Sequence, residues 1–361
     1  MKKFLGAALL LNLAIGFAQN GTPAAYYSGF DFNLTATALR DALAQKVIDT
    51  HIHPLTYQQA EDAIKIVDTD PNDSDNVFLI YGFSSTMCPD NVSDHKDHRK
   101  RNKLDDGTGA CQWNREHTFA KSLGNPDLGT DGPGSDVHHI RASDVDRNSD
   151  RGSRKFTTGS GNSGTVGAYW YPGDEWKGDI ARMMMYMYLR YGNQCLPKNV
   201  CVGTTNSTDT NMIDLLLQWN AEDPVSEMED DRNTYLGNAG NDYGQGNRNP
   251  FIDNPLLATV IWGGVAAENR WPGMFLGTTS FDLSNSVTVY PNPTTGNRIS
   301  ITSNTAIDMI ELINVNGQLV QKIQKPLAVN HSYAIENLPK GFYFVKLTSN
   351  TQTTTKKVIV N

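Results

Sequence analysis

The chain has few cysteines, no excess of basic residues and no HExxH motif. Its 361 residues include four cysteines, and 31 Lys+Arg stand against 39 Asp+Glu, which gives a formal net charge of −8. This balance argues against tight, coating-type binding to nucleic acid, because such binding uses many basic contacts. A site that holds one phosphate at a time is still compatible with it. The missing HExxH excludes the common helical zinc-hydrolase arrangement.

A strongly apolar run is confined to the N-terminus, where FLGAALLLNLAIGF follows Lys2 and Lys3. The run is short for a membrane span, polar sequence follows it, and no later segment is apolar enough to span. A charged start, an apolar stretch and a small residue before the cut are typical of a secretory signal peptide. We expect residues 1–18 to form this peptide, with cleavage after Ala18, and the mature protein to be soluble and exported.

Export makes the four cysteines candidates for disulfide bonds, because extracellular compartments are oxidising. They are Cys88, Cys111, Cys195 and Cys201. Four cysteines allow three pairings. The short separation of Cys195 and Cys201 favours their pairing, which leaves Cys88 with Cys111. Four unpaired, buried thiols are the alternative.

The composition changes near residues 265–286. All cysteines and seven of the eight histidines come before this break. From Val287, alternating apolar residues, an Asn316-Gly317 turn and Pro-Gly punctuation predict a small antiparallel β-sandwich. A chain of this length has room for two domains. We expect one domain over residues 19–265, a linker over 266–286 and a second domain over 287–361.

Four motifs follow one another in this C-terminal region: VYPNPTTG from Val289, INVNGQLV from Ile313, LPKGFYFVKL from Leu338, and the terminal KKVIV. In this order they resemble the C-terminal sorting domain of the type IX secretion system. The resemblance implies that the type IX machinery is a partner and carries the protein across the outer membrane. The tail is then either removed or kept as a surface anchor. An ordinary adhesive β-sandwich is the alternative.

The larger part mixes helix and strand patterns and predicts an α+β class. Residues 175–191 place apolar residues, with a cluster of methionines, on one helix face, and core packing explains this cluster better than a metal site. Another buried helix is expected over 210–220. Asp223 and Pro224 resemble an N-cap and first helical position for a third. Residues 76–82 predict a short buried strand.

Two polar motifs resemble metal sites only superficially. DTDPNDSDN, residues 68–76, would need glycine at position 6 and glutamate at position 12 of a calcium loop, where Asp73 and Leu79 stand. An Asp/Asn-rich turn before the strand is the better interpretation. His51 and His53 share a face if their segment is extended, but two ligands without a third favour a structural or surface role.

Two segments carry the strongest candidates for chemistry: CQWNREHTFAKS, from Cys111, and SDVHHIRASDVDRNSDRGSRKF, from Ser135. If the second is helical over SDVDRNSDRGSR, Asn148 and Arg151 share a face, on a stripe that includes Asp144. Opposite a Glu-His pair, this set suits phosphodiester hydrolysis. That reaction needs a base for water, a hard cation for the developing charge and a cationic group for the product.

Each residue of this set fits one of these needs. His117 is expected to be the base, because an imidazole with an ordinary pKa of about 6.5 accepts a proton at neutral pH. Glu116 and Asn148 offer the oxygen ligands that Mg²⁺ prefers, and Arg151 offers a planar fork for phosphate. Adjacent residues of a regular strand point to opposite faces, so Glu116 and His117 converge only where the strand bends or ends.

Six blocks occur in a characteristic order: WNREHTFAKSLG (113–124), SDVHHIRASDVDRNSDRGSRKF (135–156), KGDIARMMMYMYLRYG (177–192), LLQWNAEDPVSEMEDDRN (216–233), GNRNPFIDNP (246–255) and IWG (261–263). They resemble the endonuclease I family of secreted, sequence-nonspecific nucleases with a ββα-metal, or His-Me, finger. The resemblance implies that His117 is the base, that Glu116 and Asn148 hold one Mg²⁺, and that Arg151 lies near the phosphate. It also implies cleavage of DNA, and often RNA. The sequence leaves Mn²⁺ and Ca²⁺ open as alternatives.

Several neighbouring residues have two interpretations. Many relatives carry Leu-x-Pro where this chain has Ile140-Arg141-Ala142, which should change local rigidity rather than chemistry. His138 is expected to be buried and structural. Arg115 either contacts substrate or pairs with a local carboxylate, and DHKDHRKRNK, residues 94–103, either guides the phosphate backbone or forms a solvated loop.

Two other classes of function compete with a secreted endonuclease. A surface adhesin built on a decayed nuclease framework should have lost a catalytic position, yet all four are present. A metal-dependent phosphodiesterase acting on small nucleotides or lipids should have a closed pocket in place of an open groove. The acidic net charge slightly favours this last class.

Overall fold

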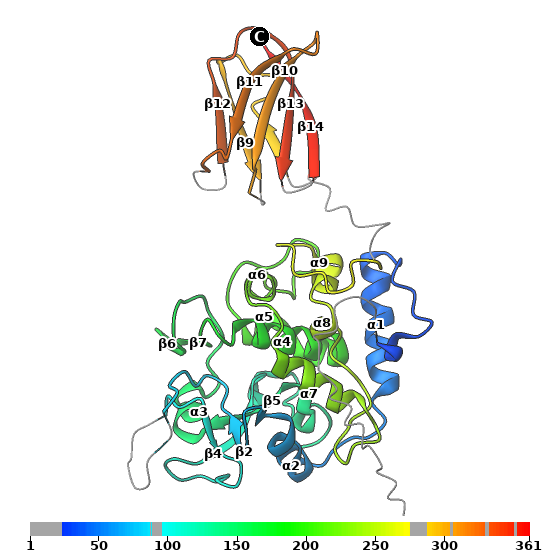
Figure 1. Ribbon diagram of the computed structural model, residues 1–361, viewed down its shortest axis with the longest axis vertical. Helices are drawn as coiled ribbons and strands as arrows, with labels where there is room; N and C mark the ends of the chain where they lie inside the picture. Colours follow the sequence, from blue (N-terminus) through cyan, green and yellow to red (C-terminus); the bar gives the residue numbers. More distant parts are fainter. Residues whose placement is uncertain are drawn as a thin grey trace, which may run out of the picture.

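The protein is described here as a computed structural model covering residues 24–86, 88, 96–274, 287–303, 306–328, 332–349 and 352–361. Two bodies are built from this chain, one of helices and short strands and one of strands alone (Figure 1). The α+β class with an all-β C-terminal region is therefore confirmed. The predicted signal peptide and residues 275–286 of the predicted linker lie outside the described residues.

Helices dominate the first body. In chain order its elements are η1 (Ala25–Tyr27), α1 (Ala36–Thr50), α2 (Tyr57–Val67), β1 (Thr69–Asp70), β2 (Asp73–Phe78), β3 (Lys100–Asn102), β4 (Trp113–His117), η2 (Lys121–Leu123), η3 (Gly132–Ser135), η4 (Val137–His139), β5 (Ile140–Asp144), α3 (Val145–Arg151), β6 (Gly164–Val166), β7 (Tyr169–Tyr171), α4 (Lys177–Tyr191), η5 (Gly192–Cys195), α5 (Pro197–Val200), α6 (Asp214–Glu222), α7 (Glu227–Gly237), α8 (Pro250–Asp253) and α9 (Leu256–Trp262).

Helix α4 is the centre of this body. It is buried over most of its length and packs against α1, α6 and α8 (Figure 1). The predicted methionine cluster lies in the hydrophobic core, with Met184, Met185 and Met187 fully buried. Methionine fills irregular core gaps well because its side chain is flexible and polarisable. The prediction of core packing is confirmed.

A short ββα unit stands beside this core. Strand β4 pairs antiparallel with β5, from Trp113 opposite Asp144 to His117 opposite Ile140, and α3 follows β5 directly. Asp144 ends the strand and caps the helix, because its carboxylate accepts a hydrogen bond from Arg147 N at 2.9 Å. The predicted long helix is therefore wrong in extent: α3 has seven residues, and Asp144 is its N-cap rather than part of a helical stripe.

A buried ionic cluster holds β5 in place. Asp68, at the end of α2, accepts hydrogen bonds from Ala142 N at 2.7 Å and from Arg232 of α7, and it pairs with Arg141 Nε at 3.0 Å. Arg141 also pairs with Asp179 of α4 at 3.2 Å. The two arginines and Asp68 are almost completely excluded from solvent. The cluster therefore ties α2, α4 and α7 to the strand that leads into α3.

Two predicted helix starts lie at the wrong residues. Helix α6 begins at Asp214, and α7 begins after Ser226, whose side chain and that of Glu229 form a reciprocal capping box. Asp223 instead ends α6, and its carboxylate accepts a hydrogen bond from Gly178 N at 2.8 Å. The Asp-Pro pair therefore marks the end of α6 and not the start of α7. The Asp223 carboxylate is used at the N-terminal end of α4 instead.

The remaining local predictions have mixed outcomes. The Asp/Asn-rich segment forms a turn between β1 and β2, with Asn72 N donating to Asp70 Oδ1 at 2.8 Å, as predicted. The predicted strand at 76–82 starts earlier, at Asp73, and ends at Phe78, although the following three residues stay buried. Along this turn Tyr81 adopts a φ of 70°, which is rare for a bulky residue.

One of the two predicted disulfides is present. Cys88 is bonded to Cys111. Cys195 and Cys201 are free and buried, so their predicted pairing is wrong. Cys195 ends η5, the short helix α5 then intervenes, and Cys201 forms a β-bridge with Phe156. Each thiol therefore packs in the core from its own backbone segment.

The C-terminal body is the predicted antiparallel sandwich. Its strands are β8 (Val287–Tyr290), β9 (Arg298–Ser303), β10 (Met309–Asn314), β11 (Leu319–Gln324), β12 (Ser332–Glu336), β13 (Gly341–Ser349) and β14 (Gln352–Val360). They form one sheet in the order β11-β10-β13-β14 and another in the order β12-β9-β8. Alternate residues of both sheets fill a separate core, and Gly317, with a φ of 78°, supplies the predicted turn.

Within the residue ranges given above, no helix combines the length and the apolar character needed to cross a membrane.

We predict that Asp68→Ala lowers the free energy of unfolding by about 3–5 kcal/mol, because it removes the carboxylate partner of the buried Arg232 and one of the two carboxylates that pair with the buried Arg141. The measurement is urea-induced unfolding. Asp41→Ala is the control, since Asp41 pairs with Arg40 on the surface and its side chain is 63% exposed. That change should cost less than about 1 kcal/mol. Equal losses for the two variants would contradict the structural importance of the cluster.

Candidate active site

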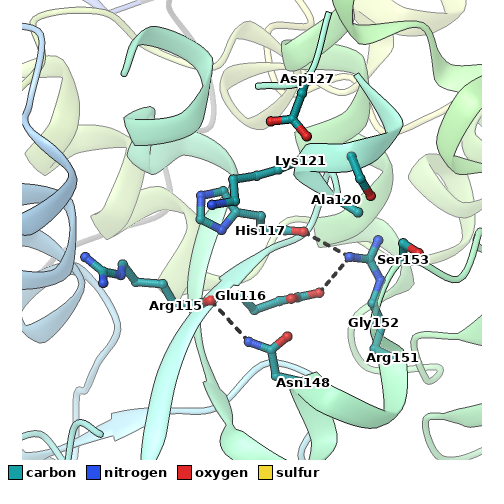
Figure 2. A pocket seen from close by; sticks show the side chains of 11 residues that line it. Arg115, Glu116, His117, Ala120, Lys121, Asp127, Asn148, Arg151, Gly152 and Ser153 are labelled. Carbon is teal, nitrogen blue, oxygen red and sulfur yellow. Dashed lines mark hydrogen bonds and ion pairs between the residues drawn. The ribbon is translucent and has the colours of Figure 1, made fainter. Parts of the chain in front are cut away.

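A cleft of about 320 Å³ lies where the ββα unit meets the loop after β4. Its lining is Arg115, Glu116, His117, Ala120, Lys121, Ser122, Asp127, Asn148, Arg151, Gly152 and Ser153 (Figure 2). The structure thus brings Glu116, His117, Asn148 and Arg151 together in one place. His117 is the last residue of β4, so the condition for the convergence of Glu116 and His117, a strand that ends there, is met.

Glu116 is almost fully buried and is held through one of its two carboxylate oxygens. Its Oε1 accepts a hydrogen bond from Tyr81 Oη at 2.9 Å and pairs with Arg151 Nη1 at 3.1 Å. Burial raises the pKa of Glu116 to about 7, and the charge of Arg151 and the hydrogen bond from Tyr81 oppose this rise. No described residue hydrogen-bonds to Oε2, so this oxygen is available to a ligand.

His117 is held by three contacts. Its Nε2 lies 2.9 Å from Gly134 O, its ring stacks on Tyr57 with centroids 5.7 Å apart, and its edge meets the ring of His139. Burial, followed by the effect of His139, lowers the pKa of His117 to about 3. The expectation of an ordinary pKa is therefore wrong, and the imidazole is neutral at neutral pH.

The tautomer of His117 follows from its partner. A carbonyl oxygen only accepts hydrogen bonds, so Nε2 carries the proton and donates it to Gly134 O. The lone pair then lies on Nδ1, for which the described residues offer no hydrogen-bond partner. Gly134 must be a glycine, because a Cβ would stand 2.2 Å from Gly129 O.

Asn148 presents an oxygen to the cleft. Its Nδ2 donates to Asn114 Oδ1 at 2.7 Å and to Arg115 O at 3.1 Å. Both amide hydrogens are thus committed to β4, and Oδ1 has no hydrogen-bond partner among the described residues. In Figure 2 Asn148 and Glu116 face each other across the space between α3 and β4.

Arg151 is buried, and its terminal guanidinium nitrogens are bonded to other groups of the protein. Its Nη1 donates to His117 O at 3.0 Å and pairs with Glu116, and its Nη2 donates to Thr118 O at 2.7 Å. Its Nε is buried without a hydrogen-bond partner. Arg151 therefore fixes the end of β4 and the Glu116 carboxylate while its charge stays at the cleft.

The donor set determines which metals the cleft suits. Among the described residues no group of three or more His, Cys, Asp or Glu side chains lies close enough to hold an ion. Glu116 Oε2 and Asn148 Oδ1 offer two hard oxygen donors that the protein leaves free. A pair of oxygen ligands fits a cation that keeps several waters, such as Mg²⁺, and does not provide the nitrogen and sulfur ligands typical of zinc.

Comparisons with known proteins identify relatives of both parts of the chain. The family model for Endonuclease I matches residues 35–256, and that for the secretion system C-terminal sorting domain matches residues 288–361. The chain is 38% identical over 239 residues to the extracellular ribonuclease of Bacillus amyloliquefaciens, which covers 63% of this chain and 75% of that protein. It is 36% identical over 268 residues to the extracellular ribonuclease of Bacillus subtilis strain 168, covering 71% and 85%.

The chain belongs to the endonuclease I family. It is therefore a nuclease, a hydrolase of phosphodiester bonds, and its sorting domain marks it as a secreted or cell-surface protein. A solved structure of PorZ, a surface component of the type IX secretion system of Porphyromonas gingivalis, overlaps with 24% of this chain and 13% of its own. At 16% identity and a TM-score of 0.18, that overlap does not bear on the fold.

Contacts bear on two further residues of this endonuclease I family member. Arg115 pairs with the local carboxylate of Glu61 at 3.1 Å, donates to Tyr57 O and lies on the Tyr57 ring, while it also lines the cleft. His138 is buried outside the cleft, with Nε2 3.0 Å from Asn247 O and its ring against Tyr186. Its predicted structural role agrees with these contacts.

The described part of the basic run, from Lys96, is neutralised locally. Four of its cations pair with carboxylates: Lys96 with Asp150, Arg99 with Glu175, Lys100 with Asp70 and Arg101 with Asp144. These pairs argue against a guide for phosphate, because four of the five described Lys and Arg charges already have a negative neighbour, and the fifth, Lys103, donates to Ser74 O at 2.9 Å. The alternative of a solvated loop is also wrong for part of the run, since residues 100–102 form strand β3 and Arg101 is buried.

Three residues at the site of this nuclease are not among those predicted from the sequence. Tyr81 holds Glu116, Tyr57 stacks on His117, and Lys121 lines the cleft with its Nζ 5.1 Å from the Tyr57 ring. No described carboxylate pairs with Lys121. Only Lys121 could have been found from the sequence, because it is a cation just four residues after His117. Tyr57 and Tyr81 are distant from the site in sequence, and only the tertiary fold brings them to it.

We predict that this nuclease loses stability as the pH falls from about 6.5 to about 4. Burial lowers the pKa of His138 and that of His139 to about 4, so in this window the unfolded chain binds protons that the folded chain does not. The stabilisation is complete above the ordinary histidine pKa and is lost on acidification. Thermal unfolding from pH 7 to pH 4 measures it, and His138→Gln should flatten the dependence. His53→Gln, at an exposed ring, is the control; an unchanged slope in both variants would contradict this assignment.

Proposed function

We propose that this protein is a secreted endonuclease that hydrolyses internal phosphodiester bonds of RNA and DNA with water. His117 acts as the general base, and Glu116 and Asn148 hold one divalent cation. The observation that carries the proposal is that His117, whose Nδ1 has no hydrogen-bond partner among the described residues, lines the same cleft as Glu116 and Asn148 with their two unengaged oxygens. The extracellular ribonuclease relatives support RNA as a substrate, and the resemblance of the motifs supports DNA.

The reaction that these residues support is a single displacement at phosphorus. A water molecule in the cleft gives a proton to His117 Nδ1 while its oxygen attacks the phosphorus atom, and one ester P–O bond breaks. The departing oxygen takes a proton from solvent, and His117 later returns its own proton to solvent. The hydrogen bond to Gly134 O strengthens as the ring gains positive charge, which favours proton transfer.

The low pKa of the free base requires a contribution from the substrate. A base with a pKa of about 3 is weak in the free enzyme, because burial disfavours the imidazolium. The bound phosphodiester brings a negative charge next to the ring, and this charge raises the affinity of Nδ1 for a proton. We therefore propose that the base reaches its working strength only when substrate is bound.

The family to which the chain belongs generally depends on a divalent metal. Glu116 Oε2 and Asn148 Oδ1 are the atoms that would hold it, and we propose Mg²⁺ because both donors are hard oxygens. When bound, this ion supplies Lewis-acid stabilisation of the charge that develops on the phosphate. Tyr81 and Arg151 act on the carboxylate itself, because their contacts with Oε1 orient Glu116 and favour its ionised form.

Two cations remain for the phosphate. Arg151 lines the cleft and contributes its charge through space, since its terminal nitrogens are already bonded to the protein. The ammonium group of Lys121 donates to Tyr57 Oη at 3.5 Å and has no carboxylate partner among the described residues, and we propose that it also contacts a phosphate oxygen of the substrate. The two cations balance the charge of the bound phosphodiester and of the departing product.

We also propose the path of the protein out of the cell. Residues 1–18 direct export and are removed, residues 19–265 form the nuclease, and residues 266–286 link it to the sorting domain of residues 287–361. The match of that domain supports the type IX machinery as the partner in this step.

We predict that His117→Ala abolishes cleavage of both circular double-stranded DNA and RNA while thermal unfolding stays close to that of the parent protein. EDTA should abolish cleavage by the parent, and added Mg²⁺ should restore it. His53→Ala, outside the cleft, is the matched control and should retain full activity. Gel analysis of the two substrates gives the result. Full activity of His117→Ala would overturn the assignment of the base, and full activity in EDTA would overturn the metal.

A further inference from the structure

A second hollow lies next to the catalytic cleft. It has a volume of about 530 Å³ and is lined by Ser153, Arg154, Lys155, Gly167, Ala168 and Tyr169. Ser153 lines both hollows, so the two lie next to each other. One wall is the chain directly after α3, and the other is the β6–β7 hairpin, which lies beside α3 in Figure 1. A substrate longer than the catalytic cleft can therefore extend along this wall.

The two cations of this hollow have no carboxylate partner among the described residues. Arg154 donates to the carbonyl of Asp150, and Lys155 Nζ donates to Lys198 O at 3.0 Å. This differs from the basic run, where Arg99 and Lys100 are each paired with a carboxylate. In a chain with a net charge of −8, cations that keep their full charge beside the site are suited to bind phosphate.

An exposed aromatic ring stands beside these cations on a fixed support. Tyr169 is 41% exposed, whereas the next residue of β7, Trp170, is buried. Trp170 N donates to Lys155 O at 2.9 Å, and Thr157 N donates to Trp170 O at 3.0 Å. These bonds attach β7 to the segment of residues 155–157, so backbone hydrogen bonds set the position of Tyr169 relative to the cations.

We propose that this hollow, the flanking subsite, binds a single-stranded segment of nucleic acid next to the scissile phosphate. Arg154 and Lys155 contact backbone phosphates, and the ring of Tyr169 stacks on an unpaired base. In a duplex the faces of the bases are covered by their neighbours, so only an unpaired segment offers a base to this ring. The inference rests on the proposed nuclease function and adds to it a preferred substrate, single-stranded polynucleotide.

The first experiment compares cleavage of two substrates, a uridine dinucleotide and a long single-stranded oligouridylate. The dinucleotide fills only the catalytic cleft, whereas the oligouridylate also reaches the flanking subsite. Tyr169→Ala should lower kcat/KM for the oligouridylate by about 5-fold to 100-fold, the range that one stacked base contributes. The double variant Arg154→Gln/Lys155→Gln should lower it as well, because two phosphate contacts are lost. Both should cleave the dinucleotide like the parent. Tyr169→Phe keeps the ring and should restore the parent rate.

The matched control for charge is Arg99→Gln/Lys100→Gln, which removes two cations that are already paired with carboxylates. It should leave both rates unchanged. A second readout is binding of fluorescent oligouridylate to proteins that also carry His117→Ala. There the salt dependence of log Kobs should become shallower by about 1.4 for Arg154→Gln/Lys155→Gln, at about 0.7 for each lost phosphate contact.

The outcomes separate this inference from the proposed function. A parent protein that cleaves neither substrate contradicts the nuclease proposal itself. A parent that cleaves both, with subsite variants that match it on the oligouridylate, overturns the flanking subsite alone. An equal loss on the dinucleotide and the oligouridylate also overturns it, because the residues would then serve the catalytic cleft. A larger loss on a duplex than on the single strand contradicts the stacking role of Tyr169.

Discussion

The hydrogen bond from His117 Nε2 to Gly134 O is the interaction on which the chemistry of this cleft depends. It fixes which nitrogen carries the proton, because a carbonyl cannot donate, and it turns the bare Nδ1 into the only proton acceptor of the ring. Gly134 reaches this position because it approaches Gly129 O too closely for any side chain. Tyr57 and His139 then restrict rotation of the ring from its face and its edge.

Burial is the second constraint on the cleft. It explains why Glu116 needs nearby hydrogen-bond donors and a positive charge. An isolated carboxylate in this place would be protonated, so Glu116 needs Tyr81 and Arg151 to favour its ionised form. Those partners both use Oε1, which leaves Oε2 for a cation. The same packing that shifts the pKa of Glu116 therefore also prepares it as a ligand, and the ionic cluster around Asp68 holds the strand on which this packing rests.

Local sequence predicts which helices and strands this protein has better than it predicts their boundaries. It also predicts the residues of the site better than the residues that hold them in position. The four residues of the family motif reach one cleft because β4, β5 and α3 are contiguous in a ββα unit. Tyr81 comes from the turn after β2 and Gly134 from the short helix η3, and the positions of both depend on the whole fold. The start of α7 was misplaced because an Asp-Pro pair and a Ser-Glu capping box compete within four residues, and tertiary packing at Gly178 decides between them. The pairing of Cys195 with Cys201 failed because closeness in sequence does not set the direction of side chains around a short helix.

The most direct test of this view is the tautomer of His117 in the intact protein. Long-range ¹H–¹⁵N correlation spectra at neutral pH, with His117→Ala to assign the signals, distinguish a protonated ring nitrogen from a bare one. We predict a neutral ring with the proton on Nε2 and a bare Nδ1. A proton on Nδ1, or a fully protonated ring in the free enzyme at neutral pH, would contradict the arrangement on which the proposed chemistry is built.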